Sequence, residues 1–317
     1  MTHLKHIAIL VFSGLLLIAC GQEQPNQTDD AHLQVMVSIL PQAEFVERIG
    51  GERVKVGVLV PPGQGPATYE PTPKQMTELA DAQIFFSIGV DFERALLSSI
   101  ERTLPELKIV DTREGITLRT MTAHHHNEGD PGSVGHDETG DQHSHQHDEH
   151  SHEQAGADPH IWLAPELVQQ QARNIAAALI GEDPGHRTFY EANLDSYLAD
   201  LQALDNQLRE SLAPVRGKTL LVYHPAWGYF ADAYGLRQEA IEMLGREPTG
   251  RQLARIIEHA RTEDVRVIFV QAQFSRSSAE AVAEAIGGSV VVMDPLARDH
   301  LANLERVARE IGAALNP

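Results

Sequence analysis

The chain has 317 residues, of which 42% are hydrophobic and 5% aromatic, so it is long enough for two domains, or one large domain, with a packed core. Its 25 Lys and Arg face 45 Asp and Glu, and the formal net charge of −20 argues against a nucleic-acid-binding role, which needs a concentrated basic face. One cysteine excludes an internal disulfide framework and cysteine-rich zinc sites. Nine of the 17 histidines lie between His124 and His152.

The N-terminus carries a short apolar run that ends at the only cysteine. Residues 7–18 are too few to span a hydrocarbon core, which takes about 20 residues, and this predicts a signal peptide. The LIAC sequence that ends at Cys20 resembles the bacterial lipobox; the alternative is an ordinary signal peptide with an incidental cysteine. We expect a lipoprotein signal peptide over residues 1–19, lipid attachment at Cys20 and a flexible polar tether over residues 20–31. The protein is then membrane-anchored and extracytoplasmic, in the periplasm or on the outer cell surface.

Apolar runs alternate with helical patterns through the first half of the chain. Strands are expected at residues 33–39, 54–60, 84–88 and 108–110, with helices at residues 42–49 and 73–80. Strands separated by single helices need crossover connections, which predicts a parallel sheet. We therefore expect an N-terminal α/β lobe over residues 32–185.

Residues 122–157 interrupt this pattern. They include nine His and eight acidic residues, no Lys or Arg, and Val134 as the only large aliphatic residue, so the composition predicts a disordered insert. Clustered imidazoles and carboxylates predict weak, auxiliary metal binding, although a solvated loop whose histidines are not used is the alternative. The histidines concerned are His124, His125, His126, His136, His143, His145, His147, His150 and His152.

The second half begins with helical patterns and then returns to alternating strands and helices. Helices are expected at residues 165–180, 186–212, 251–260, 277–286 and 301–315, and strands at residues 219–223, 265–270 and 290–293. The second helix is long enough to connect two lobes. The predicted fold class is α/β, with two lobes that each contain a mostly parallel sheet, a linking helix at residues 186–213 and a C-terminal lobe at residues 214–317.

Three polar residues stand at the ends of predicted strands or in a comparable loop. His224 directly follows the strand at residues 219–223, Asp294 follows the strand at residues 290–293, and His160 lies where the first lobe resumes after the insert. Ligands in α/β sheets bind at the carboxyl ends of strands, and two imidazoles with a carboxylate suit zinc. Each residue taken alone is more often a hydrogen-bonded structural group, and spacing does not bring the three together.

Ordered motifs along nearly the whole mature chain resemble one family. They are SILP (38–41), IGG (49–51), PG (62–63) before YEPTP (69–73), GVDFE (89–93), the acidic His-rich insert followed by DPHIWL (158–163), HPAWGYF (224–230), YGL (234–236), EP (247–248), QFS (273–275) and DPL (294–296). The chain thereby resembles the cluster A-I (cluster 9) metal-binding lipoproteins of zinc and manganese ABC importers, most closely the zinc branch. The resemblance implies high-affinity capture of Zn²⁺ in the cleft between the lobes and delivery to a zinc ABC permease and its ATPase.

By this resemblance His160, His224 and Asp294 occupy three of the four ligand positions. The family usually has a histidine two residues before the Tyr of the YEPTP segment, and Ala67 stands there in this chain. The fourth ligand is then water, which we favour, or Gln64, Tyr69 or Glu70, or a histidine of the insert.

The sequence is also compatible with other functions. Manganese-binding relatives commonly have a carboxylate in place of His224, so histidine here favours zinc, with manganese or another divalent metal as the alternative. A metal-dependent adhesin is a further alternative. Three protein ligands and an open position also fit catalytic zinc, but the chain has no HExxH-type motif, and we expect a monomeric binding protein with no catalytic residues.

The other chemistry-bearing residues have ordinary interpretations. The remaining histidines of the mature chain are expected to be solvated; they are His32, His186, His259 and His300. Trp162 and Trp227 are expected to pack the cleft walls, and Glu93 and Glu247 are either permease-docking residues or solvated surface.

Overall fold

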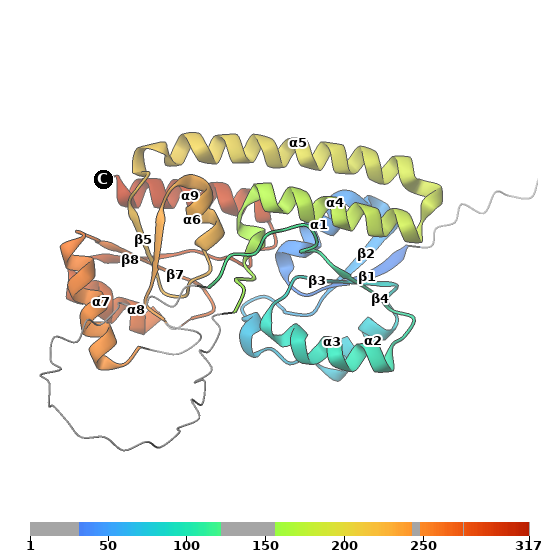
Figure 1. The fold of residues 1–317 in the computed structure, drawn as a ribbon, viewed down its shortest axis with the longest axis horizontal. Helices are drawn as coiled ribbons and strands as arrows, with labels where there is room; N and C mark the ends of the chain where they lie inside the picture. The colour runs from blue at the N-terminus through green and yellow to red at the C-terminus, as the bar shows by residue number, and fades with distance from the viewer. Residues whose placement is uncertain (1–31, 122–155, 243–247, 275, 317) are drawn as a thin grey trace, which may run out of the picture. The chain divides into compact units, whose positions relative to one another are not determined.

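A computed structural model describes residues 32–121, 156–242, 248–274 and 276–316 (Figure 1). From His32 onward the chain forms one compact unit. The predicted signal peptide, Cys20, the tether, Glu247 and the nine clustered histidines lie outside the described residues. Within the described ranges, no helix has the length and apolar character needed to cross a membrane.

The first sheet is entirely parallel, with the strand order β2-β1-β3-β4. Its strands are β1 (Leu33–Val37), β2 (Val54–Val58), β3 (Ile84–Ser87) and β4 (Lys108–Asp111). Its helices are α1 (Leu40–Gly50), α2 (Pro73–Ala80) and α3 (Asp91–Thr103). Val35 of the central strand β1 is in register with Val56 on one side and Ile84 on the other. The central strands β1 and β3 are largely apolar and buried, as expected for a parallel sheet covered on both faces, whereas the edge strands β2 and β4 are partly exposed.

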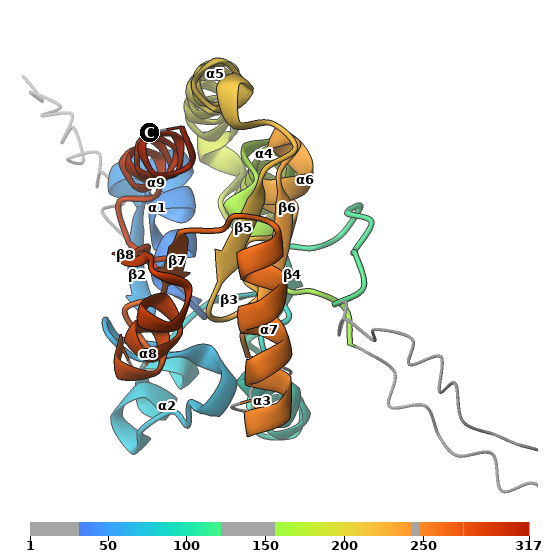
Figure 2. The same cartoon turned by 90° about the vertical axis from the view of Figure 1, so that its left-hand side faces the viewer.

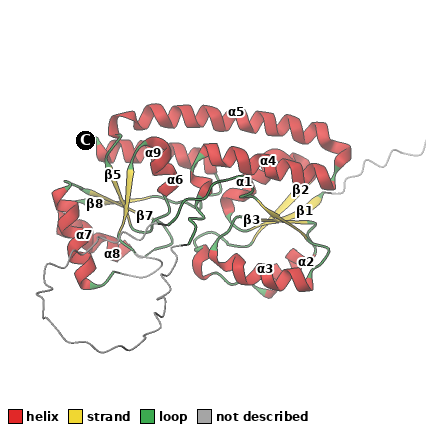
Figure 3. Cartoon of the chain, in the orientation of Figure 1, coloured by secondary structure: helices red, strands yellow, loops and turns green. Residues whose placement is uncertain are grey.

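The second sheet is also parallel and has the order β6-β5-β7-β8. Its strands are β5 (Thr219–Val222), β6 (Arg237–Ala240), β7 (Val267–Val270) and β8 (Ser289–Val292). Its helices are α6 (Gly228–Tyr234), α7 (Gly250–Thr262), α8 (Arg276–Ile286) and α9 (His300–Leu315). Figure 3 shows the strands of both sheets in yellow and the helices in red.

Two long helices, α4 (Pro165–Glu182) and α5 (Arg187–Leu212), lie between the two sheets in sequence. Helix α5 packs against α1 and α4 of the first lobe and against α6 and α9 of the second. Figures 1 and 2 both place α5 beside α9. The short 3₁₀ helices are η1 (Gly51–Arg53), η2 (Pro66–Thr68), η3 (Ile161–Leu163), η4 (Pro184–His186) and η5 (Ala213–Val215).

One hydrophobic core extends through both lobes. It includes Val35 of β1, Leu201 of α5, Leu220 of β5 and Val307 of α9, all of them fully buried. A smaller cluster lies under α7 and α8 in the second lobe. The predicted α/β class, the two parallel sheets and the long helix are therefore confirmed.

The sequence prediction missed three elements: α3, α6 and β6. Helix α6 is only seven residues long, and β6 has the sequence RQEA, which carries no alternation of apolar residues. Most predicted boundaries agree with the structure within about two residues. Strand β1 ends at Val37 rather than at residue 39, because the segment after it turns into α1 at Leu40.

Candidate metal site

His160 and His224 come together although 64 residues separate them. His160 immediately precedes η3, and His224 follows β5. Their ring centroids are 5.4 Å apart and the rings are nearly perpendicular, at 72°. The side chain of His160 is 9% exposed and that of His224 is 19% exposed, so both imidazoles are largely withdrawn from water.

Each imidazole is held by a buried carboxylate. His160 Nδ1 lies 2.7 Å from Asp158 Oδ1, and His224 Nδ1 lies 3.1 Å from Glu242 Oε1. An ionised carboxylate can only accept, so Nδ1 of each neutral ring donates and the lone pair remains on Nε2. Metal-binding histidines are oriented in this way in zinc proteins, where the carboxylate also makes the ring a better ligand.

The backbone and one face of His224 are fixed as well. Gln271 donates from Nε2 to the His224 carbonyl at 2.7 Å, and its Oε1 accepts from the His224 amide at 3.3 Å. The Phe274 ring stacks on the imidazole with a centroid distance of 5.0 Å and an interplanar angle of 20°. The ring therefore has little freedom to rotate away from Glu242.

Burial lowers the pKa of His160, and the Asp158 carboxylate opposes this shift. His224 lowers the pKa further, whereas Asp91 at the start of α3 raises it. Because the net shift is downward, His160 is neutral at pH 7, and the neutral imidazole is the form that binds metal.

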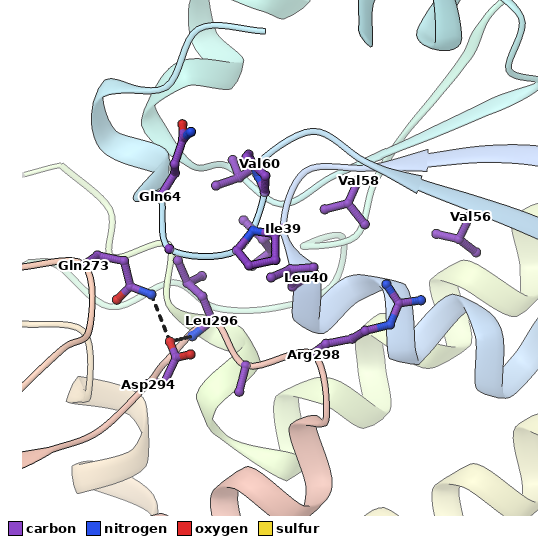
Figure 4. Close-up of a pocket in the computed structure, with 14 residues that line it drawn as sticks. Ile39, Leu40, Val56, Val58, Val60, Gln64, Gln273, Asp294, Leu296 and Arg298 are labelled. Atoms are coloured by element: carbon purple, nitrogen blue, oxygen red, sulfur yellow. Dashed lines mark hydrogen bonds between the residues drawn. The ribbon is translucent and has the colours of Figure 1, made fainter. Parts of the chain in front are cut away.

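Asp294 lies after β8 and is fixed through one oxygen. Its Oδ1 accepts from Gln273 Nε2 at 3.0 Å and from the Leu296 amide at 2.9 Å (Figure 4). Asp294 lines a cavity of about 540 Å³, together with Gln64 and Gln273. Within the described ranges, no group of three or more His, Cys, Asp or Glu side chains is arranged to hold an ion. The structure thus brings His160 and His224 together, whereas Asp294 lines a cavity whose lining includes neither histidine.

The three residues proposed as alternatives for the fourth ligand are in different environments. The Gln64 amide points away from Asp294 in Figure 4. The Tyr69 hydroxyl donates to Gln75 Oε1 at 2.6 Å, and the residue is 8% exposed. Glu70 is exposed, as is Ala67 in η2. Of the three, only Gln64 shares the cavity of Asp294.

The orienting roles of Asp158 and Glu242 were not predicted. Asp158 stands two residues before His160, and this Asp-Pro-His spacing was a usable signal, since its Oδ1 also accepts from the His160 amide at 3.0 Å. Glu242 gave no such signal, because its place beside His224 depends on β6, which the sequence pattern does not reveal.

Two expectations about surface residues are wrong. Glu93 is 1% exposed, and its carboxylate accepts from Ser38 Oγ and from the amides of Ile88 and Gly89, so it cannot dock a permease. His300 is also 1% exposed rather than solvated, because the first turn of α9 packs inward against η3 and α1.

Buried hydrogen bonds tie the His160 segment to the second lobe. Trp162 Nε1 donates to the Pro295 carbonyl at 2.7 Å, and the Trp162 carbonyl lies 2.6 Å from His300 Nε2. The Tyr229 hydroxyl donates to the Asp158 carbonyl at 2.9 Å. Trp162 and Trp227 are buried, as expected for packing residues.

The chain is similar to zinc-uptake proteins in both sequence and structure. A family model described as "Zinc-uptake complex component A periplasmic" matches residues 35–314. The high-affinity zinc uptake system protein ZnuA of Bacillus subtilis (strain 168) is 30% identical over 289 residues, which is 89% of this chain and 85% of that protein. A crystal structure of ZnuA aligns with a TM-score of 0.78 and 38% identity, over 90% of this chain and 100% of that chain. A ZnuA deletion mutant with zinc bound aligns with a TM-score of 0.77, 38% identity and coverage of 90% and 99%.

Proposed function

The chain belongs to the family of periplasmic zinc-uptake components, and from this premise we propose that it captures Zn²⁺ and delivers it to an ABC permease and its ATPase for import. The observation that carries the proposal is the pair of buried imidazoles, His160 and His224, each held at Nδ1 by its own carboxylate. This arrangement leaves both Nε2 atoms available to one cation, and imidazole nitrogen is a favoured zinc ligand.

We assign three protein ligands to the transported ion: His160, His224 and Asp294. Zn²⁺ binds the two imidazoles, and Asp294 joins them as the third ligand when the ion is captured. Water takes the fourth position. The absence of a ligand side chain at Ala67, the Gln75-bonded hydroxyl of Tyr69 and the direction of the Gln64 amide support this choice over a fourth protein ligand.

The chemistry of this ligand set favours zinc over manganese. Manganese prefers carboxylate, carbonyl and water oxygens, whereas two nitrogen ligands suit zinc. The carboxylates of Asp158 and Glu242 add negative charge behind the imidazole rings without coordinating the ion. Release then requires Asp294 or one imidazole to withdraw from the ion.

The parts of the chain outside the described residues complete the proposal. A lipid on Cys20 would hold a monomeric protein at the membrane, close to its permease. The clustered histidines of the insert would contribute weak, auxiliary zinc binding, separate from the transport site.

Zinc titration of the protein, monitored by competition with a chelator, tests the function and the site. The wild type is expected to hold one Zn²⁺ tightly and to show no hydrolytic turnover. His224→Ala should lose more than the roughly 100-fold in affinity that marks the upper range for orienting residues. Deletion of residues 124–152 should retain the tight site. His259→Ala is the matched control, because His259 lies in the same lobe and its Nε2 pairs with Glu239 at 3.0 Å.

Two results would count against the proposal in different ways. A wild-type protein without tight zinc would refute the function. One tight zinc with unchanged affinity in His224→Ala would refute the site and leave the function standing.

A further inference from the structure

Arg119 reaches both a carboxylate of the His160 segment and a carboxylate of the second lobe. It lies after β4, and its Nη1 is 3.4 Å from Asp158 Oδ2, while its Nε is 3.2 Å from Asp232 Oδ2 in α6. The Asp158 side chain is only 2% exposed, whereas that of Asp232 is 64% exposed. Arg119 therefore compensates a buried charge at one end and makes a surface ion pair at the other.

Gly228, the first residue of α6, leaves the space that the guanidinium occupies. A Cβ atom at residue 228 would lie 1.2 Å from Arg119 Nη1 and 3.0 Å from Asp158 Oδ2. Gly228 has no positive φ angle, so its backbone conformation does not itself require glycine. The passage of the Arg119 side chain to Asp158 is the feature that excludes a larger residue.

Tyr229 closes the same arrangement from α6. Its hydroxyl donates to the Asp158 carbonyl at 2.9 Å and accepts from the Arg119 amide at 3.0 Å. The guanidinium carbon lies 5.6 Å from the centre of the Tyr229 ring. In addition, the Asp158 amide donates to the Arg119 carbonyl at 2.9 Å. Asp158 is thus held through its amide, its carbonyl and its carboxylate.

We propose that Arg119 is a positioning residue of the metal site. It fixes the Asp158 carboxylate, which in turn fixes the His160 ring, and it ties this segment to the lobe that carries His224. The inference rests on the proposed zinc-binding function. Its physical basis is that a buried carboxylate without a countercharge is costly and rearranges, and a rearranged Asp158 no longer sets the direction of His160 Nε2.

Substitution of Arg119 should weaken zinc binding without removing a ligand. We expect Arg119→Met to lower zinc affinity about tenfold, at the lower end of the range for residues that orient a ligand. Arg119→Lys should recover part of this loss, because it restores the charge but not the two-sided contact. Arg187→Met is the control, since Arg187 makes an exposed ion pair with Glu191 on α5 and should bind zinc like the wild type.

A double-mutant cycle with Gly228 tests the mechanism. Gly228→Ala leaves every charge in place but forces the guanidinium out of its position, so it should cause a similar loss of affinity in the wild type. In the Arg119→Met background the same substitution should cost less, because the clash with the guanidinium is gone and only the 3.0 Å approach to Asp158 Oδ2 remains. Strong non-additivity of this kind is expected only when two residues act through one contact.

Two further measurements separate positioning from general damage. The unfolding free energy of each variant shows whether it folds, and the visible absorption spectrum of Co²⁺ in the site shows whether the coordination geometry has changed. In the metal-free protein, the His160 amide, which donates to Asp158 Oδ1, should exchange its hydrogen faster in Arg119→Met.

The outcomes are distinguishable. Wild-type zinc affinity in folded Arg119→Met, or an equal effect of Gly228→Ala in both backgrounds, would overturn the proposal. Failure of the wild type to bind zinc would refute the proposed function instead, and the hydrogen-exchange comparison would still decide whether Arg119 holds the Asp158–His160 pair.

Discussion

Glu242 and Asp158 hold the two imidazoles in place, and neither is a proposed zinc ligand. The Glu242 side chain is 3% exposed, and its Oε1 lies 3.1 Å from His224 Nδ1. Orienting carboxylates of this kind commonly account for 10- to 100-fold in metal affinity, roughly. We therefore expect the affinity of the proposed zinc site to depend on residues that do not contact the ion.

We predict that Glu242→Gln lowers zinc affinity by about 10- to 100-fold. Glutamine keeps the size of the side chain but removes the negative charge. Its amide can also turn Nε2 instead of Oε1 toward Nδ1 of His224, so it no longer fixes which ring nitrogen carries the proton. Glu239→Gln is a close control, because Glu239 lies on β6, carries the same charge and pairs with His259 rather than with His224. Equal zinc affinity in Glu242→Gln and Glu239→Gln, measured by chelator competition, would contradict the role given to Glu242.

Only some residues of the candidate site could be predicted from the sequence. His224 and Asp294 could be identified as candidate ligands from their positions after apolar strands. Only the resemblance to a known family placed them in one site with His160. The partner of His224 could not be predicted, because Glu242 reaches it only through the parallel pairing of β6 with β5 and the bond from the Glu242 amide to the Tyr223 carbonyl at 2.8 Å.

Helix α9 begins at a buried histidine that joins three elements. His300 Nε2 lies 2.6 Å from the Trp162 carbonyl, its amide donates to Glu44 of α1, and its ring makes an edge contact with Phe45. Burial lowers the pKa of His300 to about 4, although the bond to Trp162 opposes the shift. The start of α9 thus requires a neutral imidazole.

This arrangement predicts a specific pH dependence of stability. The unfolded chain binds a proton at His300 with a pKa of about 6.5, whereas the folded chain does so only near pH 4. The unfolded state therefore binds more protons between these values, and stability falls as the pH falls through this window. The contribution lost by pH 5 is about 2 kcal/mol.

Urea unfolding of metal-free protein at pH 7 and pH 5 measures the effect. In His300→Gln, which keeps a donor for the Trp162 carbonyl, the change in unfolding free energy between the two pH values should be about 2 kcal/mol smaller than in the wild type. Burial raises the pKa of Glu44, which acts in the opposite direction, but Glu44 is present in both proteins and its contribution largely cancels. An identical pH dependence in the two proteins would show that His300 does not remain neutral.

Element prediction succeeded for most elements with clear apolar periodicity, but it missed α3, in which Phe92, Leu96 and Ile100 stand at helical spacing. It also failed where tertiary contacts decide. Helix α2 was predicted with its observed bounds, and in the structure Pro73 and the Thr72 capping box with Gln75 mark its start. Strand β6 was missed because it is polar and is stabilised by pairing with β5. The burial of His300 was missed for a similar reason, since its partners come from α1 and η3.

At the scale of the whole molecule, the two lobes are joined by shared packing. The main hydrophobic core contains residues of both lobes, and α5 packs against helices of both. The bond from Trp162 to the Pro295 carbonyl adds a buried polar connection. The two lobes were predictable from alternating strands and helices, whereas their common core was not, because it depends on which helix faces meet.

We predict that the metal-free protein unfolds in a single calorimetric transition. Zinc at 1,000 times its dissociation constant should then raise the unfolding free energy by about 4 kcal/mol, because it binds only the folded state. His224→Ala should show no comparable shift at the same zinc concentration. Two separate transitions, of which zinc shifts only one to higher temperature, would contradict the inference that the lobes unfold together.

The strand order is the same in both sheets, since each runs second, first, third and fourth strand of its lobe. The carboxyl ends of all four strands therefore lie at one edge of each sheet. In the second sheet, the proposed ligands His224 and Asp294 follow β5 and β8. Residue 67, which follows the second strand of the first sheet, has no ligand side chain in this chain. The side chain at such a strand end can therefore change while the backbone of the sheet that carries it stays the same.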